Sequence, residues 1–156
     1  MNETKISNLG DHVGYWLRCL SNFVSYNFAE RLSEEDVSVP QWVVLRTLYS
    51  HDNITLNQLA QLVGLDKSSV SRMVERLVQR KLVNRDEGND RRSLGLSLTP
   101  DAKNLVPRLA KHADQNDGSF LKTLSQKQRK EFLGTIKQLL DANGWKSSER
   151  GRYGIE

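Results

Sequence analysis

Residues 65–99 read LDKSSVSRMVERLVQRKLVNRDEGNDRRSLGLSLT, and this stretch decides the fold class. Its first half carries apolar side chains at helical spacing, which predicts a helix with one buried face. These side chains are Val70, Met73, Val74, Leu77 and Val78. A shorter helix is predicted just before it, because Thr55 and Gln58 form a capping box and Gly64 suits a left-handed helix end. Two short helices joined by a glycine turn indicate a helix-turn-helix, although an ordinary helical hairpin has the same pattern.

The second half of the stretch predicts a β-hairpin. Residues 82–85 suit a short strand, and residues 94–98 alternate leucine with Gly or Ser, as in a strand with one buried face. Residues 86–90 between them are rich in Asp, Asn and Gly, which favour turns. A hairpin that follows a helix-turn-helix is a wing. Arg91 and Arg92 near its tip suit the narrow minor groove of A·T-rich DNA.

The positive charge of the chain is concentrated in the same stretch. The 156 residues include 23 Lys and Arg against 19 Asp and Glu, for a formal net charge of +4. Residues 67–92 hold eight basic and four acidic side chains, so they account for the whole surplus. Clustered basic charge is typical of a surface that binds a polyanion such as DNA, but a solvated arginine-rich helix face has the same composition.

Further helices are predicted on both sides, so the expected fold class is mainly α with a small β-hairpin wing. Besides the helix-turn-helix, helices are expected over residues 9–32, 41–50 and 101–117, with a last one after the Ser125–Gln128 capping box. Pro40 is expected to open the second of these. Pro107 should bend or break the helix that contains it, and Asp117-Gly118 should end that helix.

The expected domains are a dimerisation domain and a DNA-binding core. Residues 1–36 form the N-terminal helix of the dimerisation domain, residues 37–100 form the winged helix-turn-helix core, and residues 101–156 form the C-terminal helices and tail. The outer helices have apolar faces that the small core cannot cover, so the first helix should pack on the last two or on a second copy. A two-fold homodimer is the natural solution, because palindromic DNA needs matching symmetry.

The order of these elements resembles the MarR family of winged helix-turn-helix transcriptional regulators. The specific similarities are the RM…RL passage from helix to strand, the Asp90-Arg91-Arg92 motif and the Leu98-Thr99 entry to the next helix. One departure is Lys81, which stands where glycine is common. The resemblance covers residues 9–142. It implies a homodimeric repressor that binds a palindromic double-stranded DNA operator and is released by a small aromatic carboxylate or phenolic effector.

The resemblance also implies a role for individual side chains at the DNA interface. The expected readers of the major groove are Ser68, Ser69, Ser71 and Arg72, whose hydroxyl and guanidinium groups bind phosphates and base edges. Arg76 is expected to face a phosphate, and Arg92 to enter the minor groove. Asp90 and Arg91 are expected to shape the tip of the wing.

A ligand pocket is expected between the winged core and the dimerisation domain, as in the family. Tyr15, Arg18 and Asn22 share one face of the first helix, and Arg46 is the lone charge in an otherwise apolar segment. An unpaired buried charge is costly, so Arg46 either binds an anion, pairs with an acid or lies at an exposed helix edge. An aromatic carboxylate would suit this guanidinium, with Tyr15 or Trp16 stacked on its ring.

Redox and metal switches fit the sequence less well. Cys19 is the only cysteine, and a reactive thiol needs a depressed pKa, for which Arg18 is the only nearby charge of the right sign. Cys19 is therefore expected to be a structural or pocket residue, with a redox switch as the alternative. His12, His51 and His112 are widely separated and lack ligand partners at helical spacing, so no metal site is expected.

The remaining function classes are an enzyme and a protein-interaction adaptor. The chain has no nucleophile elbow, P-loop or HExxH motif, so we expect neither an enzyme nor a cofactor. An adaptor with a winged-helix fold remains an alternative. The polar N-terminus is not typical of a secretory signal, and no apolar run is long enough to span a membrane, which together favour a cytoplasmic protein.

Overall fold

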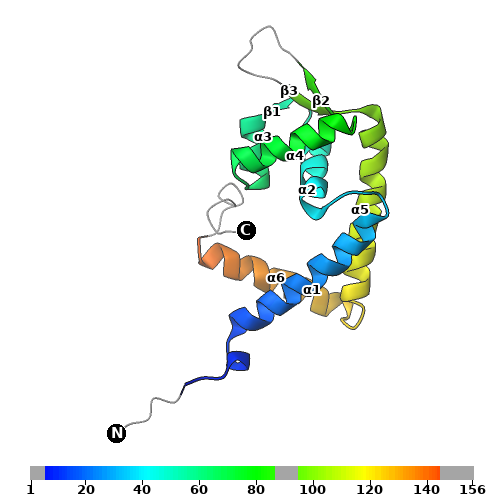
Figure 1. Ribbon diagram of the computed structural model, residues 1–156. Coiled ribbons are helices and arrows are strands. Elements are labelled where there is room, and N and C mark those ends of the chain that lie inside the picture. The colour runs from blue at the N-terminus through cyan, green and yellow to red at the C-terminus, as the bar shows by residue number, and fades with distance from the viewer. Residues whose placement is uncertain (1–5, 87–94, 145–156) are drawn as a thin grey trace.

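The computed structural model describes residues 6–86 and 95–144 (Figure 1). This part of the chain holds six α-helices and a small three-stranded antiparallel sheet, so the predicted fold class is confirmed. Helices α2 (Val39–Ser50), α3 (Leu56–Val63) and α4 (Lys67–Gln79) and the sheet form the winged core at the top of Figure 1. Helix α5 (Pro100–Phe120) runs from this core to the opposite end of the molecule, where α1 (Val13–Ser33) and α6 (Gln126–Ala142) lie.

The elements follow the predicted order with some shifts at their ends. The helical elements are a 3₁₀ turn Leu9–Asp11 (η1), α1 Val13–Ser33, α2 Val39–Ser50, α3 Leu56–Val63, α4 Lys67–Gln79, α5 Pro100–Phe120 and α6 Gln126–Ala142. The strands are β1 Ile54–Thr55, β2 Val83–Asp86 and β3 Gly95–Leu98. Helix α1 therefore begins after a separate turn rather than at residue 9. Helix α2 begins before Pro40, because the side chains of Ser38 and Gln41 form a capping box.

The helix-turn-helix forms as its capping residues predict. Thr55 and Gln58 form the expected capping box, and Gly64 ends α3 in the left-handed conformation, with φ of 71°. Helix α4 begins at its N-cap residue Asp66. On its inner face Val70, Val74 and Leu77 are buried, and Met73 and Val78 pack against the same core.

The sheet has one strand more than the sequence indicates. Strand β3 lies in the centre and pairs antiparallel with β2 and with β1. Strand β1 has two residues, Ile54 and Thr55, which is too short for an alternating pattern to be visible. This strand joins the start of α3 to the wing, because Ile54 pairs with Leu96 and Thr55 pairs with Gly95.

Helix α5 is longer and more continuous than predicted. It passes through Pro107 and ends at Phe120, so the expected end at Asp117-Gly118 is wrong. Pro107 and Gly118 are both exposed, so backbone groups left without a helical partner there can bind water. The buried residues of this helix, Leu105, Val106 and Leu109 among them, keep their helical spacing across the proline.

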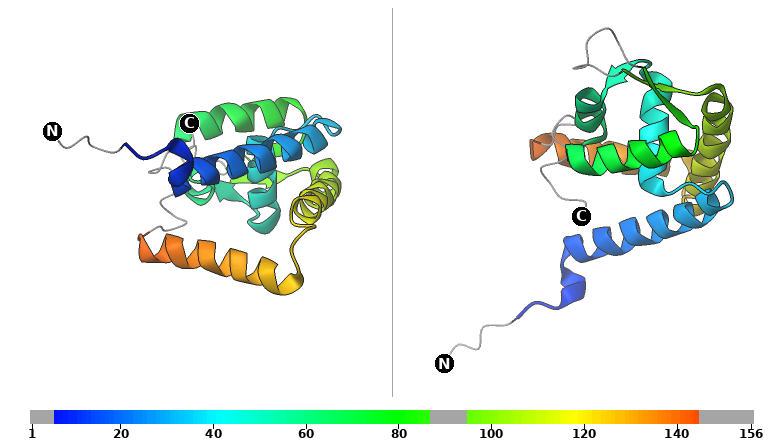
Figure 2. Two further views of the ribbon diagram at one scale, coloured as in Figure 1. Left: turned by 90° about the horizontal axis from the view of Figure 1, so that it is seen from below. Right: turned by 45° about the horizontal axis from the view of Figure 1, so that its top comes forward.

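The apolar core lies where α2, α3, α4, the sheet and the first half of α5 meet. Leu45, Leu59, Leu77 and Leu109 are among its fully buried side chains. From α1 only Leu32, in the last turn, is buried, and no residue of α6 is buried. The two views in Figure 2 show α6 apart from α1. We expected α1 to pack on both α5 and α6, and within one chain it packs on α5 alone.

None of the helices in residues 6–86 and 95–144 has the length and hydropathy needed to cross a membrane.

Candidate nucleic-acid interface

Asp66 organises the first turn of α4. Its Oδ1 atom accepts a hydrogen bond from the backbone N–H of Ser69 at 2.9 Å and another from the hydroxyl of Ser68. These bonds, that from Ser68 above all, hold the pKa of the Asp66 carboxyl well below its usual range. The cap therefore stays ionised at neutral pH and fixes the backbone that carries the two serines.

Three of the five side chains predicted to contact DNA through this helix are exposed on its outer face. Ser68, Arg72 and Arg76 are exposed, at spacings of four residues that place them on one side of the helix. Ser69 is half-buried, and its Oγ accepts a hydrogen bond from the Arg72 guanidinium at 3.4 Å. Ser71 is half-buried beside the core residue Val70, which leaves it less access to a groove than Ser68 has.

Helix α4 and the hairpin that follows it are linked by an ion pair. Glu75 on α4 and Arg85 on β2 form an ion pair with a separation of 3.9 Å. A partly exposed pair at this distance adds little stability. The pair joins an acid of α4 to the strand that leads to the wing tip.

The base of the wing is described, and its tip is not. Strands β2 and β3 pair antiparallel from Val83 opposite Leu98 to Asp86 opposite Gly95, so the predicted hairpin strands are confirmed. Asp90, Arg91 and Arg92 lie outside the described residues. Their contacts with DNA stay a prediction.

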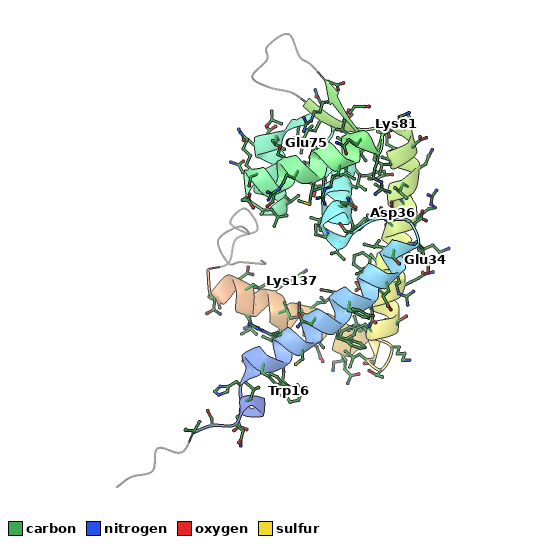
Figure 3. All side chains as sticks on the ribbon, in the orientation of Figure 1. Trp16, Glu34, Asp36, Glu75, Lys81 and Lys137 are labelled. Carbon is green, nitrogen blue, oxygen red and sulfur yellow. The ribbon has the colours of Figure 1, made fainter. Side chains whose placement is uncertain are left out.

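The four residues predicted to bind a ligand do not form one site in the single chain. Tyr15, Arg18 and Asn22 are exposed on the N-terminal half of α1. Figure 3 shows the neighbouring Trp16 at the far end of the molecule from Glu75 on α4. The rings of Tyr15 and Trp16 meet edge to face at 5.2 Å between centroids, and a hydrogen bond with Cys19 raises the pKa of Tyr15.

Arg46 is exposed on α2, which matches the exposed helix edge among the alternatives that the sequence left open. Its guanidinium binds the hydroxyl of Ser50 and lies 5.8 Å from the ring centroid of Tyr49. The apolar segment around Arg46 does not bury it, because α2 buries only the side chains that face α3 and α5, such as Val44, Leu45 and Leu48.

Two polar contacts that the sequence did not predict hold the link between α1 and α2. Arg108 on α5 binds both carboxylate oxygens of Glu35 at 3.0 Å, and these hydrogen bonds lower the pKa of Glu35. Arg80, at the end of α4, binds the backbone oxygen and the carboxylate of Asp36. The partners are 44 or more residues apart in sequence, so no local pattern points to them.

The alternative redox and metal switches would use Cys19 or a cluster of metal-ligating side chains. Cys19 is a free, exposed thiol. Within the described residues, no group of three or more His, Cys, Asp or Glu side chains is placed to hold a metal ion.

These features together define a winged helix-turn-helix protein: a capped helix with exposed serine and arginine side chains, a glycine turn before it and an antiparallel hairpin behind it. The sequence model of the MarR family matches residues 37–94, which cover the second helix, the helix-turn-helix and the wing. The chain therefore carries a MarR-type domain at residues 37–94, and it is similar to DNA-binding transcriptional regulators rather than to enzymes.

Similar proteins extend the likeness beyond the winged core. The transcriptional regulator SarZ of Staphylococcus haemolyticus is 24% identical over 140 residues, which cover 89% of this chain and 94% of that protein. The structure of PcaV, a transcriptional regulator of Streptomyces coelicolor, has a TM-score of 0.75 at 26% identity and covers 85% of this chain and 97% of its own. The structure of BpsR of Bordetella bronchiseptica has a TM-score of 0.77 at 24% identity, and the match covers 86% of this chain and 98% of BpsR.

Proposed function

We propose that this protein is a homodimeric repressor that reads a near-palindromic operator with helix α4 of each copy. One observation carries the proposal: Asp66 caps a helix whose outer face presents Ser68, Arg72 and Arg76 to solvent. Arginine in a major groove binds guanine through two hydrogen bonds, and serine hydroxyls bind phosphates or base edges. In this account Arg72 reads a base, and Arg76 contacts a phosphate.

The proposed serine contacts differ in what they offer DNA. The hydroxyl hydrogen of Ser68 is donated to Asp66, so this side chain presents mainly its lone pairs to an incoming group. Ser69 and Ser71 are half-buried and would contact the backbone of DNA at the edge of the groove. Arg92 on the wing tip, with Asp90 and Arg91 beside it, would supply the minor-groove contact.

The proposed dimer rests on apolar side chains that the single chain leaves uncovered. They gather on η1, on the N-terminal half of α1 and on α6, and comprise Leu9, Val13, Trp16, Leu17, Phe23, Leu133 and Leu139. Such a surface on one end of a small protein is typical of an association interface. A two-fold dimer through α1, α5 and α6 would cover it and would place two copies of α4 for two half-sites.

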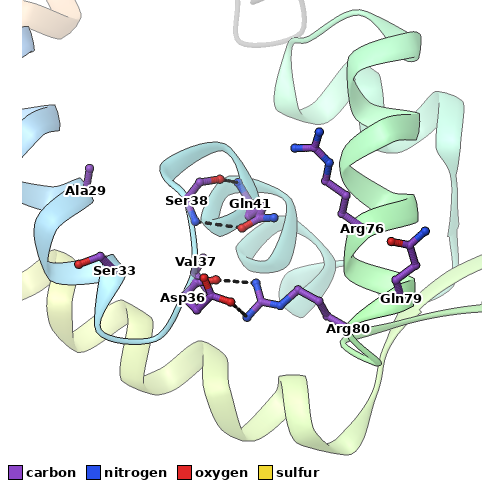
Figure 4. Close-up of a pocket in the computed structure, with 9 residues that line it drawn as sticks. All are labelled: Ala29, Ser33, Asp36, Val37, Ser38, Gln41, Arg76, Gln79 and Arg80. Carbon is purple, nitrogen blue, oxygen red and sulfur yellow. Dashed lines mark hydrogen bonds and ion pairs between the residues drawn. The ribbon is translucent and has the colours of Figure 1, made fainter.

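The proposed effector is a small aromatic carboxylate or phenol that releases the operator. The DNA binding of BpsR is regulated by 6-hydroxynicotinic acid, but that likeness, at 24% identity, shows the fold alone. Arg76 and Arg80 of α4 line an open cavity of about 580 Å³ (Figure 4), and their positive charge supports an anionic effector. Tyr15, Arg18, Asn22 and Arg46 would contribute to such a site only where the second copy of the dimer approaches them.

The test compares a base contact with a phosphate contact. An operator is first selected from random-sequence duplexes by the wild-type protein. Changing Arg72→Ala is expected to weaken binding to this operator by ~1–3 kcal/mol while affinity for an unrelated duplex changes little, because only the operator offers the matching base. Fluorescence anisotropy with both duplexes gives the two affinities. Equal weakening on both would make Arg72 a phosphate contact, and failure to select any duplex would favour the adaptor.

A further inference from the structure

The link between α1 and α2, residues 34–38, binds two other helices through neighbouring acids. Arg108 of α5 donates two hydrogen bonds of 3.0 Å to the carboxylate of Glu35. Arg80, at the end of α4, contacts both the backbone oxygen and the carboxylate of Asp36, with 3.4 Å between Nη2 and Oδ2 (Figure 4). One short segment therefore connects the C-terminal end of α4 to α5.

The link is itself firmly attached to the protein. Val37 is 3% exposed and belongs to the apolar core. Its N–H bonds the backbone oxygen of Leu32, in the last turn of α1. Asp36 has a left-handed backbone with φ of 53°, a conformation that aspartate adopts more readily than most residues. A segment fixed in this way can position the helices that bind to it.

The end of α4 has a second attachment to α5, at the start of that helix. The hydroxyl of Thr99, the N-cap residue of α5, donates a hydrogen bond of 2.9 Å to the backbone oxygen of Lys81. Arg108 lies roughly 13 Å further along the same helix, at about 1.5 Å per residue. A single attachment lets α4 pivot against α5, whereas attachments at two separate points fix the angle between the helices.

Apolar packing alone fixes this angle less strictly. In the described part of the chain, α4 packs on α2, α3 and β2, and α5 packs on α1 and α2, so α2 lies between the two helices. Apolar contacts have no preferred direction, and packed helices can slide against each other over small distances. Hydrogen bonds between arginine and an acid have a defined geometry. The two arginine contacts therefore select one orientation among those that the core allows.

We propose that Arg80 is a positioning residue, which through Asp36 and Glu35 sets the angle of α4 relative to α5 and thereby the half-site spacing that the dimer accepts. The inference rests on the proposed function, because spacing has a meaning only for a dimer on an operator. Helix α5 runs to the end where the two copies would associate (Figure 1). A change in this angle moves the two copies of α4 relative to each other, while the half-sites stay a fixed distance apart on DNA.

The exposure of the contact allows this role to be separated from stability. The side chain of Asp36 is 95% exposed, and that of Arg80 is 30% exposed. Solvent screens such an ion pair, so it contributes little to the free energy of unfolding. Its removal should leave the protein folded, which thermal unfolding establishes for each variant, while the angle of α4 becomes less restricted.

The first measurement is a distance within one chain and needs no DNA. Nitroxide labels are attached to cysteines at two exposed positions, Glu75→Cys on α4 and Lys111→Cys on α5, after Cys19→Ser has removed the native thiol. The labelled protein is diluted into an excess of unlabelled protein, so that only distances within a chain are recorded. Pulsed electron paramagnetic resonance then gives the distribution of distances between α4 and α5.

Loss of the contact should change this distribution. Asp36→Asn removes the carboxylate and suits the left-handed backbone, and Arg80→Gln removes the guanidinium. Each is expected to broaden or shift the distribution by roughly 1–2 Å, the scale of helix movements at interfaces. Glu34→Gln is the matched control, because it removes the same charge from an exposed position of the same link. This control should leave the distribution as it is in wild type.

The second measurement is the preferred spacing of the half-sites. Fluorescence anisotropy compares the selected operator with duplexes whose half-sites stand one base pair closer together or further apart. Asp36→Asn and Arg80→Gln should each reduce the wild-type preference by roughly two- to fivefold, the size of an exposed ion pair. Lost negative charge alone would strengthen the binding of Asp36→Asn to all three duplexes equally. The two changes combined should have no more effect than Arg80→Gln alone, because both remove the same contact.

Three results would overturn the inference. One is a distance distribution that neither Asp36→Asn nor Arg80→Gln changes. Another is tight operator binding with the same spacing preference in wild type and both variants. The last is a lower thermal stability with neither of these changes, which would make the contact purely structural. Failure to select any operator would instead refute the proposed function, and the distance measurement would still decide whether Arg80 positions α4.

Discussion

Lys81 has a left-handed backbone conformation, with φ of 57°, at the turn between α4 and β2. The resemblance to the MarR family implies that glycine is common at this position, and the backbone conformation supplies a reason. A Cβ atom in the left-handed region crowds the following carbonyl group, and glycine has none. The turn forms nevertheless, because the Lys81 N–H bonds the backbone oxygen of Val78 and the Lys81 oxygen accepts the hydroxyl of Thr99.

Changing Lys81→Gly is therefore expected to stabilise the protein. The gain is about 0.5–1 kcal/mol, since removing the left-handed strain outweighs the extra entropy of glycine in the unfolded chain. Urea unfolding at fixed protein concentration measures it. Lys81→Ala removes the same charge but keeps the Cβ atom, so it should bring no gain. A variant with glycine no more stable than the one with alanine would contradict this reading.

Residues that act through local bonds could be predicted from the sequence, and residues that act at long range could not. The capping pairs of α3 and α6 are visible as Thr55–Gln58 and Ser125–Gln128, because their partners are three positions apart. The contact between Asp36 and Arg80 spans 44 residues and depends on how α4 crosses the link. No spacing rule relates two such positions.

At the scale of elements, periodicity and capping patterns located each α-helix in the described part of the chain, and errors arose where one residue was given too much weight. Pro107 and Gly118 suggested breaks in α5, yet the helix continues because Leu105, Val106 and Leu109 pack in the core on both sides of the proline. Packing of an apolar face contributes more to a helix than the preference of one exposed residue. Arg46 shows the converse, since an apolar segment around a charge did not imply its burial.

Pro107 should cost α5 stability that a substitution can recover. Pro107→Ala restores one backbone N–H in the middle of an exposed helix face, and is expected to raise the free energy of unfolding by about 2 kcal/mol. Chemical denaturation measures this change, with the slope against denaturant expected to stay constant. An unchanged or lower midpoint would indicate that the proline is needed for a bend that positions the C-terminal half of α5.

At the scale of the whole molecule, helix α5 joins the winged core to the end where the N-terminal half of α1 and α6 lie. The winged end has a buried core, and the other end leaves large apolar side chains in contact with solvent, with Val13 73% and Leu139 56% exposed. In a monomer this apolar surface stays exposed to water, which is unfavourable, so association is favoured. DNA binding and dimer formation are therefore expected to be parts of one equilibrium, because a palindromic operator needs two copies of α4 at a fixed distance.

A single charged substitution on α6 is expected to weaken the association of the two copies in the proposed dimer. Leu139→Glu places a carboxylate in the proposed interface, where burial without a partner is costly, and should weaken dimerisation by at least about tenfold. Analytical ultracentrifugation over a range of concentrations gives the dissociation constant. The adjacent exposed residue supplies the control, as Gln138→Glu adds the same charge without removing an apolar group. A dimer equally stable in both variants would exclude this face of α6.

The central claim is that a dimer reads a near-palindromic operator with α4. The most direct measurement is the affinity of wild-type protein for the selected operator, and for the same duplex with one half-site scrambled, over a series of salt concentrations. We predict that the intact operator binds far more tightly, and that log K falls linearly with log salt concentration, with a slope of about −0.9 for each phosphate contacted. Equal affinity for the two duplexes, or binding that salt does not weaken, would contradict the account.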